Sequence, residues 1–309
     1  TLEGVRRTES HAVALSRIIS GIQAIIDGES SKGIARLLRI TDDLAVHASL
    51  RWAALIWITW AAKELGAVPL AMETAAGARD LAHTMDIRAS ATTLGLLGEV
   101  EALAGEITPA LEHLVQAEEM YESLKDSVGR ASVLLLQARL LEEAGRDGYA
   151  LAKAKEALEV APEWHGPAIY LAQHALRQGD ITQARELLEQ AREKDKTPRQ
   201  PEIDRELEMI SMVEKGEVPQ WVMARYIELR DAPPSHEVSS ELERLMLYTP
   251  GFMQLRDALA WKLLKLGRTD EALINFEVLS RRELPADLRS SVLAGMGLLA
   301  SISQRHRQV

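Results

Sequence analysis

The sequence predicts an all-α protein built from stacked helical hairpins. Apolar residues recur three and four positions apart along nearly every long segment, and the alternation typical of half-buried strands is rare. Ala, Leu, Glu and Arg, which favour helices, dominate these segments. Glycine and alanine also recur at regular long offsets along the chain, as expected of a repeated helix pair.

The composition supports a folded core and excludes thiolate chemistry. The chain has 309 residues, of which 47% are hydrophobic and 27% charged, so we expect a folded core and not wholesale disorder. The absence of cysteine excludes disulfides and any metal site built on thiolates. Because one core stops growing near ~250–300 residues, we expect two domains or an elongated array.

The charge balance argues against a nucleic-acid partner. The 46 acidic residues outnumber the 36 Lys and Arg residues, which gives a net charge of −10. Nucleic-acid binders usually carry a dense basic stripe, and none is found along the sequence. We therefore predict that the chain binds no nucleic acid.

The most apolar stretch is too short to cross a membrane. It runs only over residues 52–62 and is bounded by charges, whereas a span needs about 20 residues. We expect a buried helix there and no membrane span. The first residue is Thr1, so we expect a processed chain or a piece of a longer one. The compartment stays unknown: we favour the cytoplasm, with a periplasmic or membrane-tethered chain as the alternative if an upstream segment is missing.

The repeat is clearest in the middle of the chain. Gly145 and Gly179 are separated by an offset of 34, and the step before, from Gly105 to Gly145, is an offset of 40. We therefore expect about six extra residues near positions 123–129. The same offset of 34 separates three alanine pairs: Ala138 and Ala172, Ala150 and Ala184, and Ala157 and Ala191. Earlier steps, slightly shorter than the one from Gly105 to Gly145, lead back to Gly66 and Gly28.

Each unit makes physical sense as a helical hairpin. Around Leu171 and Ala172 the apolar residues share one helix face, and the small alanine lets a second helix approach closely. Gly179 supplies the turn, because glycine adopts positive φ without strain. One hairpin cannot bury both of its faces, so it must stack on its neighbours.

These positions resemble the tetratricopeptide repeat (TPR) family. The matching pattern is a Leu and a small residue on the first helix, a glycine at the turn, and small residues on the second helix. One unit shows it as Leu171, Ala172, Gly179, Ala184 and Ala191, and a C-terminal unit as Leu259, Ala260, Gly267, Ala272 and Phe276. The resemblance is strong over 91–200 and 252–285 and weaker over 14–90. It implies a right-handed α-solenoid.

The pattern divides the chain into three regions. Residues 1–200 are predicted to form an N-terminal TPR-like array, and residues 251–309 a hairpin followed by a helix from Pro285 to about Gln304. The resemblance implies that this last helix caps the array. Residues 201–250, which contain Pro233 and Pro234, break the pattern. They form either an irregular helical pair within one solenoid or a joint between two arrays.

We find no sequence sign of catalysis, a cofactor or a metal. Residues 295–300 match the letters of a dinucleotide loop, but no strand precedes them and the chain ends shortly afterwards. The glycines there are better explained by close helix packing. The eight histidines form no metal-ligand motif. An enzyme would need a polar pocket with a strongly perturbed titratable group. We therefore predict no enzyme, no cofactor and no metal.

The resemblance implies that partners bind on the concave surface lined by the first helices. The positions one residue beyond each small position become the groove candidates: Trp60, Glu99, Arg139, Gln173 and Trp261. Trp and Arg are common hot-spot residues. Two alternatives stay open, because Trp60 would also serve as a core residue and Arg139 as a solvated partner of nearby glutamates.

The N-terminal groove positions differ from the middle ones. The first set is apolar and the second polar; they are Leu15, Ile18, Ile22, Ile25, Ile56 and Trp60, against Arg139, Glu142, Gln173 and Arg177. We hypothesise that the N-terminal end docks an apolar helix or a second copy of the chain. The alternative is that these apolar residues are core.

The functional hypothesis is a non-enzymatic TPR scaffold or adaptor. Its groove would bind a peptide or helix of another protein within a multi-protein assembly, and self-association is a further expectation. The alternative is a sensory or regulatory TPR domain of a larger chain that responds to a peptide or small effector.

Overall fold

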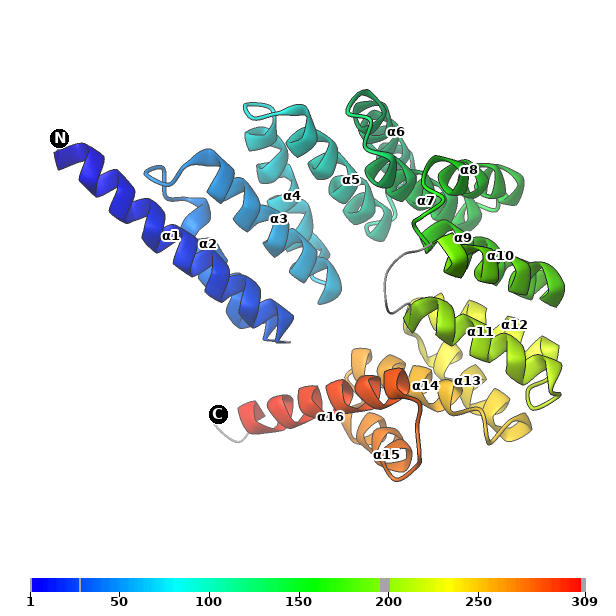
Figure 1. Cartoon of the computed structure of the whole chain (residues 1–309). Coiled ribbons are helices and arrows are strands. Elements are labelled where there is room, and N and C mark those ends of the chain that lie inside the picture. Colours follow the sequence, from blue (N-terminus) through cyan, green and yellow to red (C-terminus); the bar gives the residue numbers. More distant parts are fainter. Residues whose placement is uncertain (1, 28, 195–200, 307–309) are drawn as a thin grey trace. The chain divides into compact units, whose positions relative to one another are not determined.

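A computed structural model describes residues 2–27, 29–194 and 201–306, with side chains from residue 12 to residue 300 of those ranges. The described residues form 16 α-helices and no strand (Figure 1), which confirms the all-α prediction. The chain divides into two compact units, Thr1–Pro162 (unit 1) and Glu163–Val309 (unit 2). The predicted boundaries near residues 200 and 250 stay a prediction.

Unit 1 is a stack of helical hairpins. Its helices are α1 (Leu2–Ile26), α2 (Ser30–Thr41), α3 (Ala48–Glu64), α4 (Val68–Ala82), α5 (Ile87–Leu103), α6 (Ile107–Ser123), α7 (Ser127–Glu143) and α8 (Asp147–Val160). Each helix packs against the next in sequence, and the first helices α1, α3, α5 and α7 also contact one another in order. Contacts of this kind, between near neighbours only, are those of a solenoid.

Unit 2 begins and ends with hairpins but changes pattern between them. Its helices are α9 (Gly166–Gln178), α10 (Ile181–Lys194), α11 (Pro201–Glu214), α12 (Gln220–Asp231), α13 (His236–Tyr248), α14 (Met253–Lys265), α15 (Thr269–Ser280) and α16 (Ala286–His306). Helix α12 packs against α9, and α11 against α10, so the order of regular hairpins is broken. The sequence placed its irregular segment over these same helices, α11 to α13.

Left-handed glycines mark the turns within hairpins. Their φ values lie between 69° and 84°, and they are Gly66, Gly105, Gly145, Gly179, Gly216 and Gly267. Only glycine adopts this conformation without strain, which explains the repeated offset. Gly28, the first glycine of the predicted series, lies outside the described residues.

The expected insertion near residues 123–129 does not form a loop. Helices α6 and α7, which meet there, are each 17 residues long, whereas α8 and α9, in the next step of the repeat, have 14 and 13. The added residues therefore lengthen the two helices, and the connection between them stays short.

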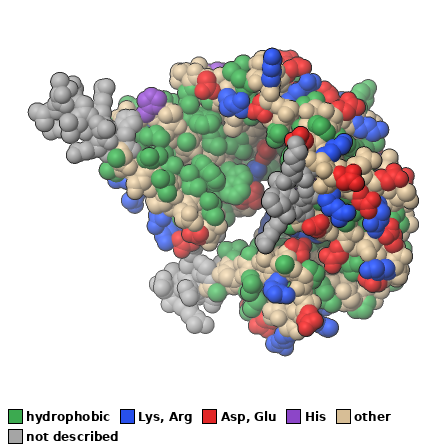
Figure 2. Space-filling view, viewed as in Figure 1, with side chains coloured by type: hydrophobic (Ala, Val, Ile, Leu, Met, Phe, Trp, Pro, Cys, Tyr) green, Lys and Arg blue, Asp and Glu red, His purple; other side chains and the backbone are tan. Residues whose placement is uncertain are grey.

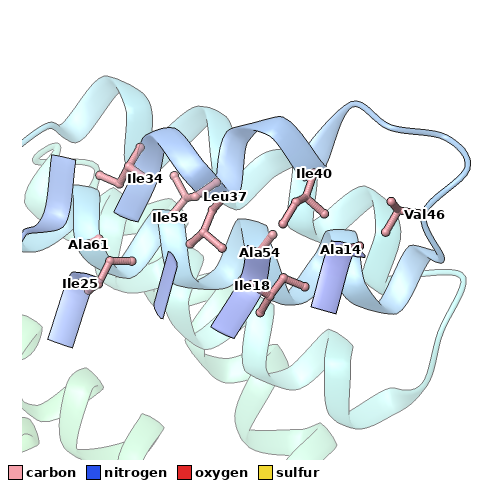
Figure 3. Packing of buried hydrophobic residues seen from close by; sticks show 10 residues of the cluster. All are labelled: Ala14, Ile18, Ile25, Ile34, Leu37, Ile40, Val46, Ala54, Ile58 and Ala61. Carbon is pink, nitrogen blue, oxygen red and sulfur yellow. The ribbon is translucent and has the colours of Figure 1, made fainter. Parts of the chain in front are cut away.

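The core of the first hairpins corrects part of the sequence interpretation. Ile18 and Ile25 are 5% and 4% exposed and pack with Leu37 and Ile58 in one cluster (Figure 3). These two isoleucines are therefore core residues, and their assignment to the groove was wrong. The reason is that Ile18 and Ile25 lie on the side of α1 that packs against α2 and α3, whereas Ile19 and Ile26 lie on its exposed side.

The last helix closes unit 2 as predicted. Helix α16 packs against α14 and α15, with Val292 and Leu299 buried. A Cβ on Gly295 would collide with the buried ring of Phe276, so this glycine permits close packing. Gly297 meets nothing within 4 Å, so the packing explanation fails for it.

Candidate functional site

Trp60 lies on the surface of α3. It is 41% exposed and stands edge-on to Trp57, with the ring centroids 5.9 Å apart. Trp57 in turn packs against the core cluster of α1, α2 and α3. Trp60 is therefore braced by the core without belonging to it, and it remains a groove candidate.

Glu99 and Arg139 lie on the next two first helices. Glu99 of α5 forms a part-buried ion pair with Lys63 of α3, so it links neighbouring helices. Arg139 of α7 is exposed. Both residues remain predicted binding residues.

Gln173 is engaged inside unit 2. Its amide donates to Glu206 Oε1 at 3.0 Å, and Arg230 donates to the same oxygen at 3.1 Å. Glu206 is 4% exposed, and its other oxygen has no hydrogen-bond partner among the described residues. Buried carboxylates need such donors, so Gln173 has a structural role beside its predicted binding role.

Trp261 lies beside an acid that the sequence analysis did not single out. Its indole Nε1 donates to Ser291 Oγ at 2.8 Å, and Ser291 donates to Asp257 at 2.9 Å. Burial raises the pKa of Asp257 to about 6, because the charged form loses hydration. This chain of hydrogen bonds holds α14 to α16.

Asp257, Trp261 and Ser291 line a pocket of about 330 Å³ within unit 2. The pocket lies among α11, α12, α14 and α16, and its lining combines four cationic side chains with two acids and an apolar wall. The charged members are Arg205, Arg230, Lys262, Lys265, Asp257 and Asp287. A volume of this size suits a small ligand.

A second hollow in unit 2 is larger and shallow. It has a volume of about 740 Å³ and lies among α9, α12 and α13. Arg225, at its edge, donates to both Glu241 and Glu228, so the charge of this arginine is compensated. Trp221, which lines the hollow, stands edge-on to Tyr248, with the ring centroids 5.2 Å apart.

An exposed apolar stripe runs along α1. It consists of Leu15, Ile19, Ile22 and Ile26, which recur four, three and four positions apart. Ile19 and Ile26 are 60% and 64% exposed, whereas Ile22 is partly buried against the core. Figure 2, drawn from the same side as Figure 1, shows hydrophobic side chains gathered over the first helices of unit 1. We call these four residues the α1 stripe.

Half of the α1 stripe was expected from the sequence, but the pocket was not. Leu15 and Ile22 were among its groove positions, but Ile19 and Ile26 were not, although their helical spacing was visible in the sequence. The pocket joins residues from 205 to 291. No local sequence pattern predicts a group of residues so far apart in the chain, and Trp261 is the only lining residue that was predicted.

The described residues contain neither a candidate metal site nor a candidate membrane span. Among them, no group of three or more His, Asp or Glu residues could hold a metal ion. No helix, over the ranges described, is both long and apolar enough to span a bilayer. Asp257, whose pKa is raised to about 6, lines a pocket with charged walls, which is the condition set for an enzyme in the sequence analysis. Its hydrogen-bond partner Ser291 accepts from Trp261.

Comparison with known proteins gives structural likeness at low identity. No protein-family model and no curated protein matches the sequence. A solved tetratricopeptide repeat protein from Parabacteroides merdae is 12% identical, with 92% of this chain and 98% of that chain covered and a TM-score of 0.43. The apo form of the quorum sensor NprR from B. thuringiensis is 10% identical, with 87% and 86% covered and a TM-score of 0.48. The description of this chain as a TPR-like helical repeat rests on its own helix packing and turn glycines.

Proposed function

We propose that the chain is a non-enzymatic helical-repeat scaffold that binds an amphipathic helix of a partner protein within a larger assembly. The observation that carries the proposal is the α1 stripe, together with the exposed Trp60 of α3. Contiguous apolar surface is uncommon on a monomer and usually marks an interaction site.

The spacing of the α1 stripe fits a helical occupant. Side chains four, three and four positions apart form the seam into which the side chains of a second helix pack, at a crossing angle of about 20°. The neighbouring polar positions Ser16, Ser20 and Gln23 carry no charge themselves. Two charged side chains border them: Gln23 donates to Asp27 at 2.8 Å, and Arg36 donates to the backbone oxygen of Ser20 at 2.8 Å. The proposed occupant is therefore an amphipathic helix, with polar side chains beside these two charges.

Trp60, Glu99 and Arg139 supply the remainder of the proposed surface. A tryptophan braced by the core loses little conformational freedom on binding, which suits a hot spot. Glu99 and Arg139, one and two first helices further on, would contact the polar side of the bound helix. Gln173 and Trp261 lie in unit 2 and stay separate candidates.

The test compares capture of partners by matched variants. Wild type, Ile19→Glu and Val128→Glu are each used as bait in a native cell extract, followed by mass spectrometry. Val128 of α7 is also exposed, at 53%, but lies outside the α1 stripe. We expect Ile19→Glu to lose a protein that wild type and Val128→Glu retain.

A second measurement establishes the kind of occupant. Peptides from the captured protein are titrated into the chain, and helical content is followed by circular dichroism. Equal retention by all three baits would overturn the proposal. A dimer by light scattering that Ile19→Glu converts to a monomer would assign the α1 stripe to a second copy instead.

A second candidate function is a sensory or regulatory domain that responds to a small effector. The pocket at Trp261 favours it, since it has the volume of a small-ligand site and contains a perturbed acid. This candidate concerns unit 2, whereas the scaffold proposal concerns unit 1.

A further inference from the structure

The charges around the pocket of unit 2 are unevenly compensated. Arg205 of α11 donates to Asp287 of α16 at 2.9 Å, so these two charges cancel. Arg230 of α12 is paired with the buried Glu206 at 3.1 Å, and with Asp231. Two of the four cations are therefore neutralised from within the fold.

The two lysines of α14 lack an acidic partner. Lys262 is 9% exposed, and its ammonium group donates to the backbone carbonyls of Arg230 and Ala232, which carry no net charge. Lys265, one turn further on, is exposed and forms no ion pair within the described residues. A buried cation usually has an anionic counterpart, and none of the side chains described here pairs with these lysines.

The pKa of Lys262 reports this lack of compensation. Burial lowers the pKa first, and the positive charge of Lys265 lowers it further, while Asp231 offsets part of the effect. A ligand carrying negative charge would stabilise the charged form of Lys262.

Asp257 is the remaining acid of the pocket lining, and its carboxylate is hydrogen-bonded to Ser291 and not to the lysines. Both of its oxygens accept from Ser291, at 2.9 and 3.0 Å. Burial raises its pKa to about 6, and the nearby Asp287 raises it as well. Arg205 is the cation that lowers it, so Asp257 is not the counter-charge of the lysines.

Part of the pocket lining is apolar. Trp261, Ala258 and Leu288 line it, and the ring of Trp261 is fixed edge-on against the buried Phe276 at 5.6 Å between centroids. A rigid aromatic wall beside two uncompensated ammonium groups selects for a molecule with a flat apolar body and an acidic group.

We infer that this pocket binds a small organic anion, with its carboxylate or phosphate group at Lys262 and Lys265 and its apolar body against Trp261. The inference names the class of effector for the second candidate function, and it rests on unit 2 alone. Failure of helix binding at the α1 stripe would therefore leave it standing.

The test uses benzoate, phenyl phosphate and the neutral benzamide as probes at low ionic strength. Binding is followed through the indole N–H resonance of Trp261 in ¹⁵N-labelled protein, assigned with Trp261→Phe. We expect benzoate or phenyl phosphate to shift this resonance saturably, and benzamide, which matches benzoate in shape, to leave it in place. The stronger of the two anions identifies the carboxylate or the phosphate class.

Variants that change the charge of the pocket lining should change the affinity for the anion in a predictable direction. Lys265→Gln should weaken anion binding about five-fold or more, and Asp257→Asn should strengthen it, because each changes the charge of the lining in the opposite direction. Lys215→Gln, on the turn after α11, is the matched control and should change nothing. Any of three results would overturn the inference. Benzoate and benzamide could shift the resonance equally, or neither anion could shift it saturably. The third such result is an anion affinity that is unchanged in Lys265→Gln.

Discussion

At the scale of single residues, Asp257 couples folding to pH. Its pKa in the folded chain, about 6, lies above the ordinary value of 3.8, because burial disfavours the carboxylate. The folded chain therefore binds more protons than the unfolded chain between these values, and it loses stability as pH rises through this window.

Asp257→Asn should accordingly stabilise the protein at neutral pH. The expected gain in the free energy of unfolding at about pH 7.5 is at most about 3 kcal/mol, and the gain should vanish below about pH 4. Urea unfolding of wild type and variant at both pH values measures it. Asp204→Asn, at an exposed position of α11, is the control for the loss of a carboxylate. A gain that is the same at both pH values would contradict the linkage.

Lys125 is the residue with the least favourable backbone conformation. It connects α6 to α7 with a φ of 54°, and it is the one non-glycine residue with positive φ in the described part of the chain. Lys125→Gly should relieve this strain and raise the free energy of unfolding by up to about 1 kcal/mol, after the entropy cost of glycine. Lys155→Gly, inside α8, should instead destabilise by about 1 kcal/mol. Thermal melts of both variants show whether the sign of the change in stability depends on the backbone conformation at the substituted position.

At the scale of helices, small residues set how closely the hairpins pack. A Cβ on Gly98 of α5 would lie 2.8 Å from Leu114 Cγ and 3.0 Å from the backbone oxygen of Ala110, both on α6. Gly77 of α4, by contrast, has room, since its nearest neighbour would be Leu55 at 3.5 Å. Two glycines within helices thus differ only in what they face.

Gly98→Ala and Gly77→Ala should therefore have opposite effects. The first should destabilise the chain by about 1–3 kcal/mol through overpacking. The second should stabilise it by up to about 1 kcal/mol, because alanine is the better helix former. Chemical denaturation of both variants is the measurement, and a stabilising Gly98→Ala would show that α5 and α6 can separate without cost.

At the scale of the whole molecule, the division into two units predicts two steps of unfolding. Each unit has fully buried side chains of its own, including Leu114 in unit 1 and Phe276 in unit 2. Regions with separate cores open with separate free energies.

Calorimetry of two core variants tests this division. Leu114→Ala and Phe276→Ala should each cost about 2–5 kcal/mol, and each should lower a different thermal transition. If both variants lower one common transition by similar amounts, the chain unfolds as a single cooperative array.

The sequence alone determined the helical class, the hairpin repeat and the turns. These features are local: a helix needs its periodic apolar face, and a turn at positive φ needs glycine, so both leave a mark on neighbouring positions. The segment of α11 to α13 was expected to be irregular because its prolines and lost alanines are visible in the sequence. The α1 stripe was half visible, since its spacing was helical but its register was not known.

Tertiary structure decided which of these faces stay exposed and which charges go unpaired. Ile18 and Ile19 are adjacent and chemically alike, yet one is 5% and the other 60% exposed, because α2 and α3 cover only one side of α1. Lys262 and Lys265 differ from other lysines only through their surroundings, which come from α12, α14 and α16 together. Burial and compensation depend on residues far apart in the chain, so no local pattern encodes them.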